Sequence, residues 1–193
     1  MGLIGEIQLA ATQIIMQYLG PLTSVVFSMA NAITVRMGHK IGEKNLAAAN
    51  STSQAGIFLS VIFMLIIAIC YFFIPERFIA VDLDVTNPEN SQLIHYTKQF
   101  FIACAIFQLF EAVRISLFGS LRALKDTSFP LLASALGFWI IPIPFGYVLY
   151  QMGLGGVGLW WGMAVGAACS AILLNRRYRI KIKNYSKICT PIL

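Results

Sequence analysis

Five apolar stretches, each close to 20 residues or longer, constrain this chain more than any other feature of its sequence. A helix of about 20 residues crosses the ~30 Å hydrocarbon core of a bilayer. Hydrophobic residues make up 58% of the 193 positions and charged residues only 11%, against about 25% charged residues in soluble domains. A soluble domain of this composition would expose too much apolar surface. We therefore predict an all-α membrane protein, a bundle of about five transmembrane helices.

The sequence predicts a transmembrane bundle over residues 1–175 and a basic tail over residues 176–193. The expected spans lie near residues 10–35, 54–74, 93–117, 129–150 and 157–174. The first span carries glutamines, serines, threonines and an asparagine, which suits a helix that faces protein or a cavity rather than lipid. Pro21 predicts a kink in this span, because proline removes a backbone hydrogen bond and clashes with the preceding turn.

Basic residues are distributed unevenly along the chain, whose net charge is +6. With five spans, eleven of the fourteen lysines and arginines fall on one side of the membrane: Arg36, Lys40, Lys44, Arg122, Lys125, Arg176, Arg177, Arg179, Lys181, Lys183 and Lys187. The positive-inside rule then predicts a cytoplasmic tail and an external N-terminus, in the inner (cytoplasmic) membrane if the protein is bacterial. Because orientation explains the basic patches, we expect no nucleic-acid partner.

Two charged residues, Glu111 and Arg114, lie inside the third expected span. An ionisable group at that depth costs about 2.5–3.5 kcal/mol and persists where it faces a bundle interior or a water-filled cavity. Gln108, Glu111 and Arg114 are three residues apart and share a helix face, and Phe107 is four residues before Glu111. Two interpretations stay open. Either the charges neutralise each other in a structural salt bridge, or Glu111 exchanges a cation or proton while Arg114 reaches toward the headgroups.

Other polar residues of the first span are secondary candidates. Gln13, Gln17, Asn31 and Thr34 could line a cavity or could form hydrogen bonds between helices. The sequence gives no support for catalysis, since it contains no nucleophile with a base at motif spacing and no phosphate-binding loop. No pair of its four cysteines has metal-ligand or redox-motif spacing. We therefore expect neither an enzyme nor a cofactor.

Glycines are frequent near the end of the chain's apolar region. Those between residues 153 and 158 predict a tight turn on the external side, between the fourth and fifth spans. Gly158, Gly162 and Gly166 then recur every four residues. Small residues at this spacing let another helix approach closely, so we predict a packing surface there.

Several short motifs follow one another along nearly the whole chain: LAATQI at 9–14, AITVRMG at 32–38, FQLFE at 107–111, LRALKDT at 121–127, a tryptophan at 139, PIPFGY at 142–147 and GGVGLWWG at 155–162. Each motif alone is weak. Their order and spacing together resemble the C-terminal half of a transporter of the MATE (multidrug and toxic compound extrusion) family. The C-terminal lobe of that family has six helices, and this chain resembles the last five.

The resemblance implies cation-coupled antiport, in which H⁺ or Na⁺ enters while a drug-like, often cationic, organic compound leaves. Glu111 matches the acidic residue of the tenth helix, where aspartate is more usual, and it is the candidate ligand for Na⁺ or the proton carrier. Phe107 stands where a tyrosine often assists, which favours a proton over Na⁺. Arg114 stands where a glutamine is more typical.

The resemblance also implies that the first helix of the lobe and the whole N-terminal lobe are missing. We therefore expect a truncated gene product, a split gene or a misassigned start at Met1, inactive alone, with membrane lipid, small organic cations and the missing lobe or upstream polypeptide as partners. Two alternatives remain. The chain could be a non-transporting membrane fragment or subunit, or an exporter of lipid or polysaccharide from the same broader superfamily.

Overall fold

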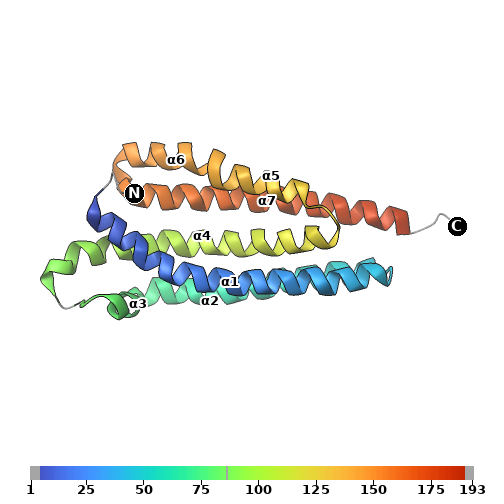
Figure 1. The fold of residues 1–193 in the computed structure, drawn as a ribbon, viewed down its shortest axis with the longest axis horizontal. Coiled ribbons are helices and arrows are strands. Elements are labelled where there is room, and N and C mark those ends of the chain that lie inside the picture. Colours follow the sequence, from blue (N-terminus) through green and yellow to red (C-terminus); the bar gives the residue numbers. More distant parts are fainter. Residues whose placement is uncertain (1–4, 86, 190–193) are drawn as a thin grey trace.

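The computed structural model describes residues 5–85 and 87–189, and within these residues it contains helices and no strands. Figure 1 shows an elongated bundle whose long helices run side by side along its long axis. The elements in chain order are α1 (Glu6–Gly42), α2 (Leu46–Phe73), α3 (Pro75–Asp82), η1 (Pro88–Asn90), α4 (Ser91–Ala123), α5 (Ser128–Ala135), η2 (Leu136–Ile140), α6 (Pro142–Leu149), η3 (Tyr150–Leu154) and α7 (Gly155–Cys189).

The chain passes along the bundle five times, which confirms the predicted fold class. α1, α2 and α4 are each long and apolar enough to cross a membrane, and so is the continuous helical stretch Ser128–Tyr185. That stretch is two passes, because the backbone reverses at Gly153 and Gly155, where φ is +93° and +55°. Such positive φ values suit glycine, which has no Cβ to clash. Figure 1 shows the two resulting arms, α5–α6 and α7, lying side by side.

The fourth pass contains a π-helical turn. The Ile141 N–H donates to the Leu136 carbonyl five residues earlier, at 3.0 Å, which is the hydrogen-bond pattern of a π-helix. Pro142 and Pro144 follow and have no N–H, so the regular α-helical ladder is interrupted there. The turn η2 therefore widens the helix between α5 and α6, and the candidate site described below contacts this turn.

α4 is the central helix. It packs against α1, α2 and α7 and has buried residues around its whole circumference, as expected for a helix surrounded by protein. α1 also approaches it very closely: a Cβ on Gly119 would lie 2.4 Å from the Ala30 carbonyl oxygen. α2, by contrast, exposes a row of large apolar side chains including Phe58, Ile62 and Ile69, which suits a lipid-facing surface.

The glycines of α7 pack as predicted. A Cβ on Gly166 would lie 2.1 Å from the Gly137 carbonyl oxygen, and one on Gly162 would lie 2.8 Å from the Pro142 carbonyl oxygen. Contacts this short leave no room for a side chain, so the two arms of the final hairpin pack backbone to backbone.

α1 and the basic segment each add detail to the predicted organisation. α1 is one continuous helix with Pro21 inside it, and it changes direction within its first half (Figure 1).

The basic segment from residue 176 continues α7 as a helix to Cys189, and residues 190–193 of the predicted tail lie outside the described residues. Tyr178 of this extension is buried and donates a hydrogen bond to Asn50 Oδ1 at 2.8 Å. The first part of the basic segment is therefore packed against the bundle.

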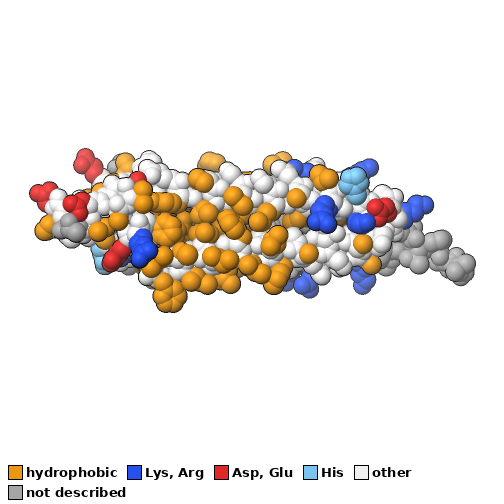
Figure 2. All heavy atoms as spheres, turned by 90° about the horizontal axis from the view of Figure 1, so that it is seen from below, with side chains coloured by type: hydrophobic (Ala, Val, Ile, Leu, Met, Phe, Trp, Pro, Cys, Tyr) orange, Lys and Arg blue, Asp and Glu red, His pale blue; other side chains and the backbone are white. Residues whose placement is uncertain are grey.

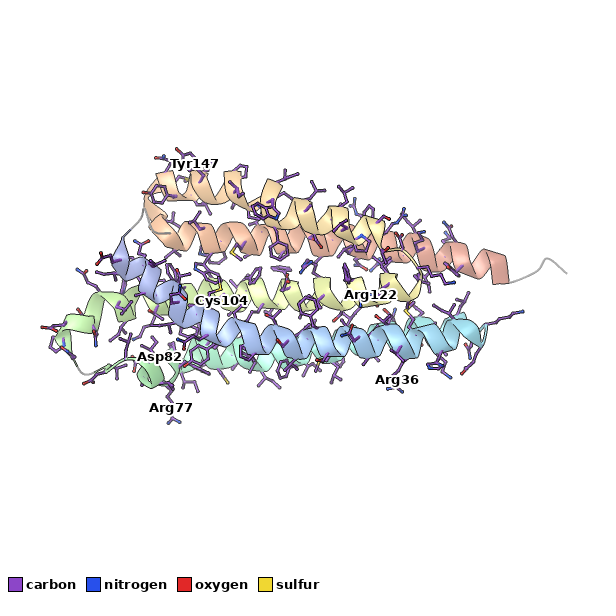
Figure 3. All side chains as sticks on the ribbon, viewed as in Figure 1. Arg36, Arg77, Asp82, Cys104, Arg122 and Tyr147 are labelled. Carbon is purple, nitrogen blue, oxygen red and sulfur yellow. The ribbon has the colours of Figure 1, made fainter. Side chains whose placement is uncertain are left out.

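Charged residues lie mainly at the two ends of the bundle. Figure 3 labels Arg36 and Arg122 at one end and Arg77 and Asp82 at the other. In the view of Figure 2, hydrophobic side chains fill the middle of the surface, and lysines and arginines gather toward the end from which the chain's C-terminus emerges. This is the arrangement that a membrane-spanning bundle needs, with an apolar band between two polar ends.

Candidate functional site

The buried centre of α4 carries the ion pair that the sequence singles out. Glu111 and Arg114 are only 6% and 7% exposed, and both lie between Cys104 and Arg122, which Figure 3 labels on this helix. The i, i+3 spacing places the two side chains within reach on one face. Because α4 is surrounded by other helices, this face is directed at protein.

Arg114 holds both carboxylate oxygens of Glu111. Its Nε donates to Glu111 Oε2 at 2.7 Å, and its Nη2 donates to Glu111 Oε1. The geometry is bidentate, the strongest arrangement of these two groups. The carboxylate is therefore neutralised by its own helix.

The same guanidinium links α4 to the fourth pass. Arg114 Nη1 donates to the Ser134 hydroxyl of α5 at 2.9 Å, and the guanidinium carbon lies 4.6 Å from the centroid of the Phe138 ring in the π-helical turn. A cation at this distance from an aromatic face is attracted by the ring's quadrupole. Arg114 thus points across to α5 and η2, and does not reach toward the headgroups in this structure.

A metal ion would have to compete with this guanidinium. Among the described residues, no group of three or more histidine, cysteine, aspartate or glutamate side chains is placed to hold one. Both Glu111 oxygens already accept from Arg114, so Na⁺ coordination by Glu111 requires Arg114 to move away. A proton needs only one lone pair of the carboxylate.

Gln108 and Phe107 lie one turn away from the pair, on different sides of α4. Gln108 is buried near the Tyr71 side chain of α2, but neither its amide nitrogen nor its amide oxygen has a partner at hydrogen-bond geometry. Such groups are rare in folded proteins because an unpaired buried polar group costs free energy. Phe107 is buried against α7, where its ring packs edge-on against Trp160 at 6.5 Å between centroids.

The polar candidates of α1 divide into two groups. Thr34 and Asn31 connect helices: Thr34 Oγ1 lies 2.9 Å from both the Ala30 and Gly119 carbonyl oxygens, and Asn31 Oδ1 accepts from Arg122 at 3.2 Å. Gln13 and Gln17 are exposed. Among the residues that the structure describes, none of these four side chains forms a hydrogen bond with Glu111 or Arg114, so α1 forms a separate polar surface.

That surface is a stripe along one face of α1. Its members are exposed and recur every three or four residues: Gln13, Gln17, Gly20, Ser24, Ser28 and Asn31. Ser24 and Ser28 donate to the carbonyls four residues earlier, which lowers the cost of placing them in an apolar surrounding. The two glutamines have no such bond, and long amides facing hydrocarbon would be costly. The serines were not among the sequence candidates, although their helical spacing was a usable signal.

A second buried acid lies outside the apolar band. Asp126, in the turn between α4 and α5, is 6% exposed and accepts from Arg177 at 2.8 Å and lies 3.3 Å from Lys181. Burial acts to raise the pKa of this carboxyl, but the hydrogen bonds and charges of Arg177 and Lys181 outweigh it and the pKa is lowered. Asp126 therefore fastens this turn to the basic extension of α7.

Comparison with known proteins agrees with this architecture. The family model MatE matches residues 1–148. The chain is 30% identical over 184 residues to a probable multidrug resistance protein NorM of Pseudomonas putida, covering 95% of this chain and 40% of that protein. It is 32% identical over 181 residues to the multidrug resistance protein NorM of Burkholderia vietnamiensis, covering 93% of this chain and 39% of that protein.

Solved structures show the same fold. The eukaryotic MATE transporter AtDTX14 superposes with a TM-score of 0.75 at 15% identity, over 96% of this chain and 42% of that one. A MATE transporter in complex with MaL6 gives a TM-score of 0.78 at 16% identity, over 94% of this chain and 39% of that one. The chain thus spans about 40% of the length of the relatives that it matches. The match of the family model to most of its residues shows that this chain is an integral membrane protein of the MatE family.

Proposed function

We propose that this chain is the ion-coupling part of a cation-coupled exporter of drug-like, often cationic, organic compounds. Glu111 is the coupling carboxylate, Arg114 is its displaceable partner, and H⁺ is favoured over Na⁺. The observation that carries this proposal is the buried Glu111–Arg114 pair and its link to Ser134 and Phe138. Through Arg114, this pair on α4 contacts both α5 and the π-helical turn η2. We propose no catalytic chemistry for this chain.

The mechanism is an exchange of partners at Glu111. Protonation of Glu111 removes its negative charge and weakens both hydrogen bonds from Arg114, so the guanidinium is free to turn further toward Ser134 and Phe138. An ion that binds one arrangement better than the other shifts the population between two conformations. In such a scheme the position of α5–η2–α6 relative to α4 follows the protonation of Glu111, which couples the ion to helix movement.

The polar stripe of α1 supports a second part of the proposal. Gln13 and Gln17 face outward from the described bundle, where contact with lipid would be costly. We infer that this stripe faces a substrate cavity or a second lobe and that export requires such a lobe. The relatives are much longer than this chain, which agrees with that requirement. The same assembly would lie in the inner membrane of a bacterium, with its basic end cytoplasmic and its N-terminus external.

A competing function has one observation in its favour. Arg114 occupies both carboxylate oxygens and also binds α5, so the pair could be a static strut of a non-transporting membrane subunit. Paired charges are the usual way in which membranes tolerate ionisable groups. The two functions differ in whether the pair opens during a transport cycle.

The deciding experiment measures coupling at Glu111. Purified chain in liposomes is tested with and without the co-expressed N-terminal part of a NorM relative, which comprises its N-terminal lobe and the first helix of its C-terminal lobe. Proton release on addition of tetraphenylphosphonium and uptake of a cationic dye are measured. We expect both signals when the second lobe is present, and we expect Glu111→Gln to abolish them under a proton gradient. Arg179→Gln, an exposed charge change on α7, is the matched control. Undiminished signals in Glu111→Gln would overturn the assignment, and an inert but correctly inserted assembly would favour the static strut.

A further inference from the structure

A groove on the outer surface of α1 and α2 lies apart from the ion pair. It has a volume of about 420 Å³ and is lined from both helices, among others by Met29, Ala32, Arg36, Ser51, Ala55 and Leu59. Gly56 allows the close approach at its floor, because a Cβ there would lie 2.3 Å from the Ile33 side chain. Small residues on the rim then leave a depression where the two helices meet.

The groove changes character along its length. α1 and α2 are antiparallel neighbours, so Arg36 and Ser51 lie at one level, near the basic end of the bundle. Met29 and Leu59 lie seven and eight residues further along their helices, about 10 Å deeper in the apolar band. The deep part is lined by apolar side chains, and the shallow part carries a guanidinium and hydroxyls. A matching ligand has an apolar tail and a polar head.

Arg36 determines which charge the polar head of the ligand must carry. Its side chain points outward from the bundle in Figure 3, and across the residues that the structure describes it forms no ion pair. Lys40, one turn further, is already paired with Glu43 at 2.8 Å. A cationic compound would be repelled at this mouth, and an anionic head would be attracted.

We propose that this groove binds an anionic membrane phospholipid, with one acyl chain along α1 and α2 and its phosphate on Arg36. The site is independent of the transport cycle and of Glu111. The bound lipid sets the depth of the bundle in the membrane, because its phosphate then lies at the same depth as the Arg36 guanidinium. Arg36 with its fork of N–H donors suits a phosphate better than a lysine would.

The test compares two lipids with the same acyl chains. The delipidated chain in non-ionic detergent is titrated with phosphatidylglycerol or phosphatidylcholine, and its melting temperature is followed, since a ligand that binds the folded state raises it. We expect phosphatidylglycerol to stabilise more. Arg36→Gln should weaken its apparent affinity about fivefold, the equivalent of about 1 kcal/mol for one charge at a lipid surface, and leave phosphatidylcholine unaffected. Arg179→Gln removes an exposed charge on α7 and should change neither.

Filling the groove tests the acyl chain separately. Ala55→Trp should abolish the response to phosphatidylglycerol, and Ala32→Phe, from the opposite helix, gives the same test if the first variant does not fold. Glycerol phosphate alone should not stabilise the chain. Equal effects of the two lipids, equal effects of Arg36→Gln and Arg179→Gln, or full stabilisation by glycerol phosphate would each overturn the proposal. So would a change of oligomeric mass in Ala55→Trp with an unchanged lipid response, because the groove would then hold a second copy of the chain.

Discussion

Glu111 and Asp126 are both buried acids that bind an arginine, yet their surroundings differ. Glu111 is paired within its own helix, in the middle of the apolar band, and its partner continues to Ser134 and Phe138. Asp126 lies at the basic end and takes its partners from α7. The first pair lies within one helix, whereas the second joins the α4–α5 turn to α7. The first arrangement suits a movable group and the second a clamp.

The largest expected effect comes from removing Arg114. Arg114→Leu leaves the Glu111 carboxylate buried without a partner, which costs about 3–5 kcal/mol of stability in comparable buried pairs. Unfolding of the purified protein in detergent, by heat and by denaturant, measures this loss. The double variant Glu111→Leu/Arg114→Leu removes both charges and should recover most of it. A double variant as unstable as the single one would show that Arg114 acts through Ser134 and Phe138 and that the charge of Glu111 matters little.

A smaller loss is expected at the clamp. Asp126→Asn removes the charge that Arg177 and Lys181 share, and both partners are about one-third exposed, so water screens the interaction. We expect about 1 kcal/mol of destabilisation, with a shift of hydrogen exchange confined to the α4–α5 turn and the end of α7. Exchange that also rises around Glu111 would contradict the separation of the two sites.

The pH dependence of stability sharpens the same contrast. The pKa of Asp126 is lower in the folded protein than its ordinary value near 3.8, so its contribution is complete above that value and is lost as the pH falls through the folded pKa. We expect the melting temperature to decline below about pH 4 and Asp126→Asn to flatten this decline. Lys98 lowers the pKa of Glu76 through a hydrogen bond and its charge, so the comparison is made in a Glu76→Gln background. An unchanged slope in Asp126→Asn would show that the clamp does not titrate in this range.

The smallest effect is expected at the opposite end of the bundle. Lys98 Nζ and Glu76 Oε1 are 2.6 Å apart but both side chains are exposed, and exposed pairs contribute little. Glu76→Gln should leave the unfolding midpoint unchanged within error at neutral pH, at low and at high salt. A salt-dependent loss would show that the loop around α3 contributes more to stability than its exposure indicates.

The sequence was sufficient for the fold because length and hydropathy decide where a chain crosses a membrane, and the five passes follow the five apolar stretches. It was also sufficient to place Glu111 beside Arg114, since their contact is within one helix turn. Ser134 and Phe138 could not be predicted, because their contacts with Arg114 depend on how the fourth pass packs against α4. The same is true of the unpaired amide of Gln108, whose lack of a partner is a property of neighbouring helices. The coupling role of Glu111 stays a prediction.

The reversal at Gly153 and Gly155 has a consequence for how the protein enters its membrane. Between residues 128 and 175 the chain has no aspartate, glutamate, lysine or arginine, so nothing holds either arm of the hairpin α5–α7 in water. The flanking charges, Arg122 and Lys125 before it and Arg176 after it, lie on the same side. Because both charged flanks stay on one side of the membrane, the two arms must cross it together. The last third of the chain is therefore a unit of insertion, delivered to the bilayer as a helical pair.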